Sequence, residues 1–419
     1  MEGMDINMRI AVMGYGVVGS GVVELFKRNH GGVLAKSTQD ELDIKYILDI
    51  RDFPGSPYAE KHIKDFNIIL NDPEVAVVVE AMGGLHPAFD FVFALLSAGK
   101  SVVTSNKELV AEKGYELLQI ANAKNVNFLF EASVGGGIPV IRPINQCLAA
   151  NEITEVAGIL NGTTNFILTK MVAENMSFVS ALKLAQELGY AEADPTADVE
   201  GIDACRKICI LASLCFGKHV YPGEVETEGI SAVTPEDFEY AAVWGGVVKL
   251  IASAKKLGNG HISVIVSPAF VKNSSMLAGV NDVFNAVLVR GDSVGEVVFY
   301  GRGAGKMPTA SAVAADIIDC AKHTVRNRLI GWQDGEPGYV ANHLDARTAL
   351  FVRGFSKNPE LSLRDAELKF GQIKELRREK QGGNELAFIT PAAAERSLRE
   401  KLASIEAFEA ASIIRITDY

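Results

Sequence analysis

The sequence predicts an α/β protein of two or three domains, the first of which is a parallel sheet covered by helices on both faces. Three observations carry this prediction. Short apolar strands alternate with helical segments through residues 1–150, which is the pattern of a doubly wound sheet. Residues 151–300 contain one strand, then helices, and then a strand-rich segment, as expected of an α+β unit. Residues 346–419 then follow the βαββαβ order of a small ferredoxin-like module.

The first domain opens with the apolar strand Met8–Met13, and the helix Val17–Asn29 follows it almost at once. The remaining segments keep the alternation, with strands at Asp43–Ile50, Val75–Glu80, Ser101–Thr104 and Asn127–Phe130 and helices at Pro87–Ala98 and Lys107–Ala123. We expect this domain to span residues 1–150. An apolar helix at Thr309–Cys320 can return to the same sheet, so residues 301–330 are expected to complete the domain.

A glycine-rich turn joins the first strand to its helix, with the sequence Gly14-Tyr15-Gly16-Val17-Val18-Gly19. The first glycine permits a tight turn, the second lets the backbone approach a pyrophosphate, and the third lets helix and strand pack closely. The unpaired N–H groups at the start of the helix then face the phosphates. Because this turn follows a strand and opens a helix, it predicts a Rossmann-type dinucleotide site, with a ligand-free turn as the alternative.

The end of the second strand leaves the choice between NAD and NADP open. Asp49 suits a ribose 2′-hydroxyl and Arg51 suits a 2′-phosphate, and a solvated strand end is the alternative for either residue. Two further turns should lie at the carboxyl edge of the sheet, where they bring Gly83, Thr104 and Lys107 toward the cofactor. Lys107 begins a helix, where the dipole favours anions, so this lysine indicates a function unless it is a chance surface residue.

The second domain is expected to span residues 151–300. It should contain a strand near Ile153–Leu160 and helices near Phe166–Glu174, Phe178–Leu188 and Ile202–Phe216, with Ser177 capping the second helix. Four apolar segments between Val247 and Tyr300 predict an open, mostly antiparallel sheet. In the third domain, the segments are Thr348–Arg353, a helix from Leu361, Gln372–Leu376, Glu385–Ile389, the helix Pro391–Ser404 and Ser412–Thr417. The basic run Lys374–Lys380 is interpreted as an exposed face.

The run Ala185–Lys207 concentrates acidic side chains ahead of one lysine. Glu192 and Asp198 belong to a segment that glycine and proline interrupt, which predicts a loop. Asp203 and Lys207 are four residues apart on a predicted helix, so they share one face. Carboxylates can hold an ammonium group and the lysine can move a proton, which suits a small zwitterionic substrate. A solvated acidic loop with a surface ion pair is the alternative.

Charge and composition argue against several classes of protein. The net charge of −11 offers no basic field for nucleic acid or an anionic membrane, and no apolar run reaches membrane-spanning length. The first ten residues lack the apolar core of a secretory signal, and the five cysteines form no CxxC pair, so a reduced, cytoplasmic protein is expected. The seven histidines lie outside every motif, so proton transfer should rest on lysine.

With these motifs in view, the chain resembles homoserine dehydrogenases over nearly its whole length. The matching motifs are the glycine-rich turn, Glu80-Ala-Met-Gly-Gly84, Thr104-Ser-Asn-Lys107, Glu131-Ala-Ser-Val-Gly-Gly-Gly-Ile-Pro139, Gly158-Ile-Leu-Asn-Gly-Thr-Thr-Asn165, Ala185–Lys207 and Gly301-Arg-Gly-Ala-Gly305. The resemblance implies reversible NAD(P)-linked reduction of L-aspartate 4-semialdehyde to L-homoserine, a step toward threonine, methionine and isoleucine. It also implies that the second domain binds the substrate and pairs subunits into a homodimer or homotetramer.

Residue by residue, the resemblance implies two catalytic lysines. Lys207 is implied as the proton donor and Lys107 as a second lysine near the substrate and the nicotinamide. Glu192 is implied as a substrate ligand, supported by Asp198 and Asp203. The chemistry is consistent with these roles, because negative charge grows on the aldehyde oxygen as hydride arrives. An ammonium group can stabilise that charge and then donate a proton.

The resemblance also implies one more cofactor contact and an ion site. Gly303 is implied to contact the nucleotide where the chain returns to the first domain. Glu131, together with backbone groups of Val134, Gly136 and Ile138, is similar to the monovalent-cation site of the family. Sodium or potassium is the expected ion, in a structural role.

The sequence departs from the family in its C-terminal module. Many members carry a regulatory ACT module with an Asp-Arg-Pro-Gly-like turn after its first strand, whereas this chain has Phe355-Ser-Lys-Asn-Pro359-Glu360. The βαββαβ order is kept, but the ligand-binding turn does not match. Threonine feedback is therefore not expected, and the ACT-like module is interpreted as structural or as the site of another ligand.

Two other functions fit parts of the sequence. A semialdehyde dehydrogenase would need a nucleophilic cysteine near the nicotinamide, and Cys147 lies in the predicted helix Pro139–Ala149 instead. A non-catalytic dinucleotide sensor would have no need of Lys107, Lys207 and Glu192 together. An assay with homoserine and each nucleotide separates these alternatives.

Overall fold

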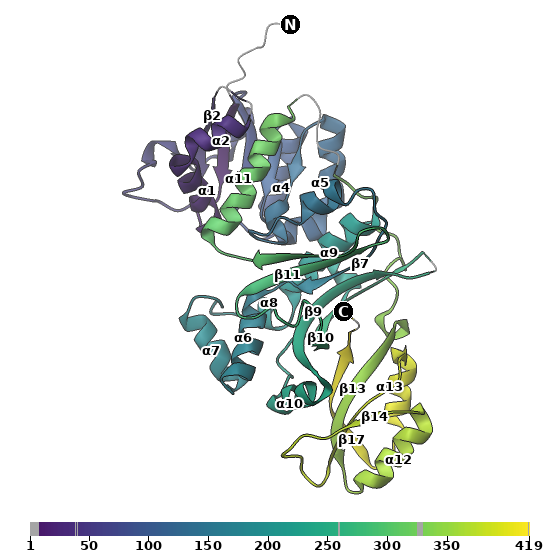
Figure 1. Cartoon of the computed structure of the whole chain (residues 1–419). Helices are drawn as coiled ribbons and strands as arrows, with labels where there is room; N and C mark the ends of the chain where they lie inside the picture. The colour runs from purple at the N-terminus through teal and green to yellow at the C-terminus, as the bar shows by residue number, and fades with distance from the viewer. Residues whose placement is uncertain (1–7, 38, 40, 259, 325–329, 418) are drawn as a thin grey trace. The chain divides into compact units, whose positions relative to one another are not determined.

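The computed structural model describes residues 8–37, 39, 41–258, 260–324, 330–417 and 419 (Figure 1). The chain divides into two compact units. Unit 1 consists of Met1–Glu152, Cys209–Pro222 and Phe299–Glu336, and unit 2 consists of Ile153–Ile208, Gly223–Val298 and Pro337–Tyr419. The first seven residues, which carry much of the prediction about a secretory signal, lie outside the described residues. In the part that the structure describes, no helix is long and apolar enough to cross a membrane.

Unit 1 is built on a six-stranded sheet in which every pair of neighbouring strands is parallel, as predicted. The strand order is β3-β2-β1-β4-β5-β6. The strands are β1 Met8–Met13, β2 Leu42–Leu48, β3 His62–Ile63, β4 Val75–Glu80, β5 Ser101–Thr104 and β6 Phe128–Leu129. This order reverses between β1 and β4, which is the switch point where such sheets bind dinucleotides.

The sheet of unit 1 is packed against helices. These are α1 Val17–Arg28, α2 His30–Ser37, α3 Phe66–Asn71, α4 Ala88–Ser97, α5 Lys107–Lys124 and α11 Lys306–Lys322. The predictions for α1, α4, α5 and α11 are confirmed to within three residues at each end, whereas α2 and α3 were not predicted. The helix predicted over Pro139–Ala149 is wrong at both ends, because only residues 141–147 are helical and Pro143–Cys147 is a π-helical turn.

The core of unit 1 explains why these segments read as continuous apolar runs. The last four residues of β1 are completely buried, as expected of a strand covered on both faces. Helix α11, drawn in green beside α1 in Figure 1, comes within contact of Gly21 on α1. A Cβ at Gly21 would lie 2.9 Å from the Lys306 carbonyl oxygen and 3.1 Å from Ala310 Cβ. Glycine at this position therefore lets the two helices approach closely.

Unit 2 contains an eleven-stranded mixed sheet with the order β12-β11-β7-β9-β10-β17-β13-β15-β14, with β8 and β16 beside that path. The strands are β7 Ile153–Ile159, β8 Glu226–Thr227, β9 Gly246–Lys256, β10 Ile262–Lys272, β11 Phe284–Gly291, β12 Gly295–Arg302, β13 Arg347–Ser356, β14 Lys374–Leu376, β15 Glu385–Ile389, β16 Ala393–Ala394 and β17 Phe408–Ile416. The pairs β7–β9, β9–β10 and β7–β11 are antiparallel, which confirms the prediction for the middle of the chain.

For the remaining helices, the sequence prediction is confirmed at some positions and wrong at others. They are α6 Gly162–Ala173, α7 Phe178–Glu187, α8 Thr196–Val199, α9 Ile202–Phe216, α10 Pro235–Trp244, α12 Pro359–Phe370 and α13 Glu395–Ala403. Ser177 caps α7 as predicted, because its hydroxyl accepts from the Ser180 N–H. The loop prediction around Asp198 is wrong for one turn, α8, whose N-cap is Pro195, and Asp194 Oδ1 accepts from the Thr196 N–H just before it. Helix α10 was missed, although Thr234 and Asp237 form a capping box around it.

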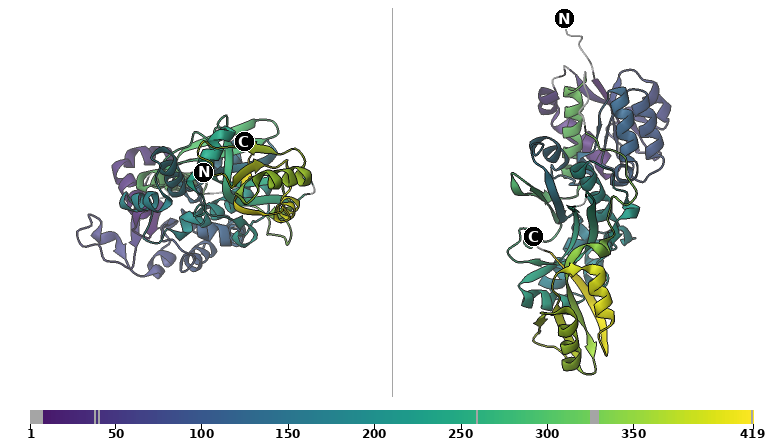
Figure 2. Two further views of the ribbon diagram at one scale, coloured as in Figure 1. Left: turned by 90° about the horizontal axis from the view of Figure 1, so that it is seen from below. Right: turned by 90° about the vertical axis from the view of Figure 1, so that its right-hand side faces the viewer.

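The C-terminal part of unit 2 follows the predicted βαββαβ order, except that the two-residue strand β16 is added before α13, and its main strands are arranged β17-β13-β15-β14. Helices α12 and α13 pack on one face of these strands, as the two views in Figure 2 help to follow. Because side chains alternate along a strand, Leu350 and Val352 of β13 enter that core. Phe351 and Arg353 face the other way, where Phe351 lies 5.4 Å from Tyr240 of α10 between ring centroids. Strand β17 pairs in parallel with β10 through Ala269 and Phe270.

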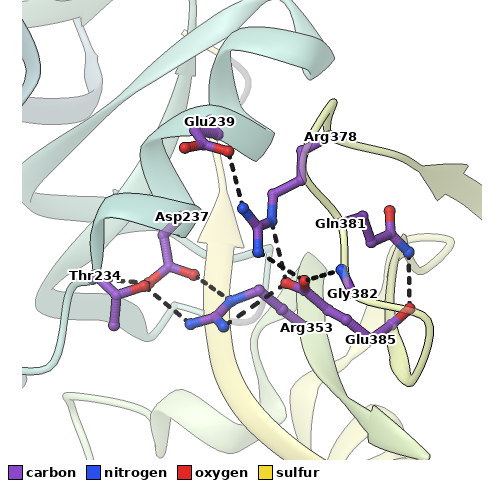
Figure 3. Close-up of polar contacts among 8 residues, drawn as sticks. All are labelled: Thr234, Asp237, Glu239, Arg353, Arg378, Gln381, Gly382 and Glu385. Carbon is purple, nitrogen blue, oxygen red and sulfur yellow. Dashed lines mark hydrogen bonds and ion pairs between the residues drawn. The ribbon is translucent and has the colours of Figure 1, made fainter.

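A buried polar network holds this module against α10 (Figure 3). Arg353 Nε donates to Asp237 Oδ1 at 3.0 Å, and Arg353 Nη2 donates to Thr234 Oγ1 at 2.9 Å. Arg378 Nη2 donates to Glu385 Oε2 at 2.8 Å, and its Nη1 reaches Glu239 of α10 at 3.1 Å. The interpretation of Lys374–Lys380 as an exposed face is therefore wrong for Arg378, whose side chain is only 14% exposed.

Candidate active site

The glycine-rich turn between β1 and α1 has the geometry that the motif predicts. Gly14 has a φ of +91°, and a Cβ there would lie 2.6 Å from the Ala81 carbonyl oxygen. A Cβ at Gly19 would lie 1.8 Å from the Gly14 carbonyl oxygen, whereas nothing lies within 4 Å of a Cβ at Gly16. The first and third glycines are therefore required by the fold, and the second leaves open space beside the backbone, where a phosphate can approach.

A cavity of about 780 Å³ lies along this turn, within the usual size range of cofactor pockets. Its lining comes from the carboxyl ends of strands β1 to β4 and the segments that follow them, together with helices α3 and α4. It includes Gly14, Gly16, Asp49, Arg51, Lys64, Phe66, Met82, Gly83 and Phe91. The predicted residues Tyr15, Val17 and Val18 adjoin this lining, since the Tyr15 N–H donates to Asp49 Oδ2 at 2.8 Å and the two valines form the first turn of α1. These residues can therefore form one dinucleotide site.

Asp49 and Arg51 at the end of β2 form a single paired group. Arg51 Nε and Nη2 donate to the two oxygens of the Asp49 carboxylate at 3.0 and 2.9 Å. The Arg51 guanidinium also lies 5.2 Å from the centroid of the Phe53 ring. The Arg51 side chain holds the pKa of the Asp49 carboxyl well below its usual range. The carboxylate is thus ionised and occupied, whereas the arginine is 59% exposed at the cavity.

Glu80, which was not predicted as a site residue, connects the turns after β4 and β5. It is completely buried, and its Oε1 accepts from the N–H groups of Met82 at 2.8 Å and Gly83 at 3.3 Å. Its Oε2 accepts from Thr104 Oγ1 at 2.5 Å. Burial raises the pKa of this carboxyl. Thr104, predicted as a cofactor contact, therefore uses its hydroxyl to hold the Gly83 turn in place.

Lys107 is the first residue of α5 and belongs to unit 1. Asn106 caps this helix, because its Oδ1 accepts from the Leu109 N–H at 3.1 Å. The Asn106 side-chain N–H group donates to the Gly84 carbonyl oxygen at 2.7 Å. The start of α5 is thereby fixed beside the Gly83–Gly84 turn, whose first residue lines the cavity.

Glu131 lies in the core of unit 1, at 3% exposure. Its Oε1 accepts from the N–H groups of Val140 and Ile141 at 2.5 and 2.8 Å, and its Oε2 accepts from the Arg142 N–H at 2.8 Å. The carboxylate therefore anchors the short helix that follows Ile138. Among the described residues, no three or more His, Cys, Asp or Glu side chains are grouped to hold a metal ion.

The triple-glycine segment after Val134 lies against the chain that returns near residue 303. A Cβ at Gly136, which has a φ of +57°, would lie 2.2 Å from the Gly303 carbonyl oxygen. The Gly137 N–H donates to the Arg302 carbonyl oxygen at 3.2 Å. Gly303 is buried at this contact. The structure thus brings together Gly136 and Gly303, two site residues that are far apart in the sequence.

Asp316 of α11 is a second buried acid that was not predicted. Its Oδ2 accepts from the Glu131 N–H at 2.9 Å, and its Oδ1 pairs with Arg142. Burial raises the pKa of the Asp316 carboxyl to about 7. The only sequence signal for it was an acidic residue inside an otherwise apolar helix. Asp316 ties the returning helix to the segment that holds Glu131.

Lys207 of α9 lies in unit 2 and is buried, at 8% exposure. Its Nζ donates to Asp203 Oδ2 at 2.6 Å and to the Leu160 carbonyl oxygen at 2.8 Å. The predicted sharing of one helix face is confirmed. The alternative of an ordinary surface ion pair is wrong, because the Asp203 and Lys207 side chains are 4% and 9% exposed.

Asn161, which was not predicted as a functional residue, joins the two acids of this cluster. Its Nδ2 donates to Asp203 Oδ2 at 2.9 Å and to Asp198 Oδ1 at 2.6 Å. Glu192 is an exposed residue of the loop before α8, and the Gln186 side chain donates to its backbone carbonyl oxygen at 3.0 Å. The structure thus brings Asp198, Asp203 and Lys207 together, whereas no contact joins Glu192 to them among the described interactions.

The fold and these sites together indicate the class of protein. A β3-β2-β1-β4-β5-β6 parallel sheet with this glycine-rich turn and cavity is a Rossmann-type dinucleotide-binding fold. A buried lysine hydrogen-bonded to a carboxylate is an arrangement that a nicotinamide-linked oxidoreductase can use for proton transfer. The chain thus has the parts of a dinucleotide-dependent dehydrogenase of a small polar substrate.

Comparison with known proteins gives the family. Residues 14–131 match the homoserine dehydrogenase NAD binding domain, and residues 139–318 match homoserine dehydrogenase. A homoserine dehydrogenase from Synechocystis sp. is 44% identical over 320 residues, which cover 75% of this chain and 73% of that protein. The crystal structure of a homoserine dehydrogenase from Thiobacillus denitrificans has a TM-score of 0.88 at 35% identity and covers 98% of both chains.

A third relative is a hyperthermophilic archaeal homoserine dehydrogenase in complex with NADPH, with a TM-score of 0.64 at 27% identity. It covers 77% of this chain, and all of that chain is covered. The chain belongs to the homoserine dehydrogenase family. It is an NAD(P)-dependent oxidoreductase that acts on a CH–OH group. It catalyses the reversible reduction of L-aspartate 4-semialdehyde to L-homoserine in threonine, methionine and isoleucine biosynthesis.

Proposed function

We propose that Lys207 is the proton donor in the reduction of L-aspartate 4-semialdehyde. The observation that carries this proposal is a buried ammonium group fixed by two hydrogen bonds, to Asp203 and to the Leu160 carbonyl oxygen. When bound, the nicotinamide supplies the hydride. Lys207 stabilises the charge on the substrate oxygen and then gives up one N–H proton to it, so that a new O–H bond forms. The amine retains the electron pair and recovers a proton from solvent.

We also propose roles toward the substrate for Lys107, Glu192 and Asp198. The ammonium of Lys107 adds positive charge beside the aldehyde and the nicotinamide. Glu192, on its exposed loop, holds the substrate ammonium with support from the anionic Asp198 and Asp203. Carboxylates suit this role because charge-assisted hydrogen bonds to an ammonium are short and strong.

We propose that NADP is the preferred cofactor. Gly14, Gly16 and Gly83 border the cavity, and Gly303 is the proposed contact from the returning chain. Two cations, Arg51 and Lys64, line the same cavity. Asp49 is already occupied by Arg51 and the Tyr15 N–H, which leaves it poorly placed to accept both ribose hydroxyls of NAD. A 2′-phosphate instead gains charge-assisted hydrogen bonds from Arg51.

The cofactor preference can be tested with Arg51→Ala. We expect the KM for NADP to rise on the order of tenfold or more, because a charge-assisted hydrogen bond is lost. The KM for NAD should fall or stay unchanged, because Asp49 becomes available to the ribose. Equal effects on both nucleotides would refute the preference. The exposed Arg377, which pairs with Glu375 on the C-terminal module, supplies a charge-matched control in Arg377→Ala.

We also propose a monovalent cation, sodium or potassium, at Glu131 with backbone oxygens of Val134, Gly136 and Ile138. The residues fit such an ion, since a buried carboxylate and carbonyl groups are the hard oxygen ligands that alkali cations prefer. The carboxylate already accepts three backbone N–H groups, so its remaining capacity suits a weakly held, structural ion. The thermal midpoint should rise with added potassium or sodium over an isosmotic choline control, and Glu131→Gln should abolish the rise.

The ACT-like module and the three-domain division at residues 1–150, 151–300 and 346–419 are also proposals. We propose a structural role for the module, supported by the buried contacts of Arg353 and Arg378 with α10. Threonine at millimolar concentration should leave the activity unchanged, and a strong inhibition would refute this role. We further propose a homodimer or homotetramer that pairs through β12, the edge strand with which the sheet order begins, where Tyr300 is 56% exposed. Tyr300→Glu should shift the mass measured by light scattering.

The proton-donor assignment is tested with purified Lys207→Ala. We expect kcat for homoserine oxidation to fall on the order of 100- to 10,000-fold, because general acid–base catalysis contributes about that much. The dissociation constant of NADP should stay unchanged. Lys183→Ala is the matched control, because Lys183 forms an exposed i,i+4 pair with Glu187 on α7. Retention of turnover in Lys207→Ala would refute the assignment.

A further inference from the structure

Asn161 occupies the junction between β7 and α6, next to the cluster of Lys207. It is the N-cap of α6, and its Oδ1 accepts from the Thr164 N–H at 2.8 Å and from Thr164 Oγ1 at 3.0 Å. These two donors fix which end of the amide faces the helix. The Nδ2 group must therefore point the other way, toward the acids. At 5% exposure, the side chain is effectively closed off from solvent.

Both N–H groups of this amide are used by carboxylates. One donates to Asp198 Oδ1 at 2.6 Å and the other to Asp203 Oδ2 at 2.9 Å. The oxygen of Asp203 that accepts from Asn161 is the same one that accepts from Lys207 Nζ. A single neutral amide thus holds two anions close together and limits the rotation of the carboxylate that directs the lysine.

The backbone around Asn161 is itself held rigidly. The residue before it, Leu160, supplies the carbonyl oxygen that accepts the second Lys207 hydrogen bond. A Cβ at Gly162 would lie 2.8 Å from the Val283 carbonyl oxygen, so the turn is packed tightly against that loop. Asn165 Nδ2 donates to the carbonyl oxygens of Val280, Asp282 and Phe284, which anchors the same helix turn. Both partners of the lysine therefore depend on the β7–α6 turn.

We propose that Asn161 is a positioning residue for proton transfer. It sets the direction of the Lys207 ammonium through Asp203 and keeps Asp198 beside them. This inference rests on the proposed role of Lys207 as proton donor. It predicts that loss of the amide slows the proton step without weakening the binding of the nucleotide.

The test compares Asn161→Ser with Asn358→Ser. Serine caps helices about as well as asparagine, so both variants keep a cap, and Asn358 caps α12 in the C-terminal module by accepting the Leu361 N–H. Only Asn161→Ser removes the bridge between the acids. We expect its kcat to fall on the order of 10- to 100-fold, because a small misplacement of reacting groups slows a reaction by about that much. Asn358→Ser should retain the wild-type kcat.

Two further readouts separate positioning from simple loss of structure. Rates are referred to the concentration of nucleotide-binding protein, so unfolded material does not count as slow enzyme. The solvent deuterium isotope effect on kcat should increase in Asn161→Ser, since proton transfer becomes slower, whereas a purely structural role leaves it unchanged. Asn161→Asp, which keeps the cap but has no amide donors, should lose at least as much kcat as Asn161→Ser.

The outcomes distinguish this inference from the proposed function. If Lys207→Ala is inactive but both Asn161 variants turn over like the wild type, the positioning role is wrong and the proton donor stands. If Lys207→Ala remains active, the proton-donor assignment is wrong, and the positioning role that rests on it is wrong as well. An unchanged isotope effect together with a reduced kcat in Asn161→Ser would also overturn the positioning role.

Discussion

Replacing Arg353 by methionine should destabilise the protein by loosening the C-terminal module from α10. The Arg353 side chain is 6% exposed and its partner Asp237 is completely buried. Methionine keeps the aliphatic length but removes the guanidinium that donates to Asp237 and Thr234 (Figure 3). The Asp237 carboxylate would then remain buried without its counterion.

The size of the effect follows from what each partner keeps. Breaking a buried ion pair by removing one member costs about 3–5 kcal/mol of unfolding free energy. Asp237 still accepts from the Thr234 N–H and hydroxyl, and Glu385 still pairs with Arg378 at 2.8 Å. The lower end, about 3 kcal/mol, is therefore expected. Asp237→Asn in the Arg353→Met background should recover most of this loss, because it removes the uncompensated charge.

The assay is urea unfolding followed by the fluorescence of Trp244, the last residue of α10, in a common Trp332→Phe background. The chain has two tryptophans, so this background leaves one reporter. Arg396→Met is the control, since Arg396 and Asp345 form a pair with side chains 47% and 61% exposed. Such pairs are worth at most about 1 kcal/mol. A loss in Arg353→Met no larger than that of the control would refute the reasoning.

Two other predictions concern unit 1. Gly19→Ala should abolish NADP binding in a fluorescence titration, because the new Cβ would lie 1.8 Å from a carbonyl oxygen of the same turn, whereas Gly31→Ala, with nothing within 4 Å, should bind normally. Acidification should destabilise the protein through His219, whose Nδ1 accepts the Trp332 indole N–H at 2.8 Å and whose pKa is lowered by burial. The unfolded chain then binds the proton first, so this stability is present above about pH 6.5 and declines as the pH falls toward the lowered pKa. His219→Gln should lack this component of the thermal midpoint between pH 7.5 and 5.5, and parallel pH profiles would contradict the assignment.

The parts of the fold that sequence reasoning predicted well are those with local signals. The strands of unit 1 are continuous apolar runs, and the glycine-rich turn constrains its own backbone, so β1 and α1 follow directly. The pairing of Asp203 with Lys207 was also predictable, because both lie four residues apart on one helix. Local periodicity is sufficient where an interaction spans one helical turn.

The parts that were missed depend on contacts between distant segments. The sequence showed Glu80 only as the end of a strand, yet its buried carboxylate accepts a hydrogen bond from the Thr104 hydroxyl and joins two turns. Arg378 looked like one charge in an exposed run, yet its partner Glu239 lies 139 residues away. Asn161 could be recognised as a helix cap, but not as a donor to acids 37 and 42 residues further on. The spacing of such residues in the sequence does not indicate that they are in contact in the folded chain.

The parallel pairing of β10 with β17 joins the final segment of the chain to the middle of a continuous sheet. The Phe270 carbonyl oxygen accepts the Thr417 N–H at 3.0 Å, so main-chain groups deep in unit 2 depend on the last few residues for a partner. Truncation ahead of β13 would leave those groups unpaired along the edge of β10, and an unpaired strand edge is a template for aggregation. Any shortened version of this enzyme would have to shield that edge with a charge, a proline or a bulge.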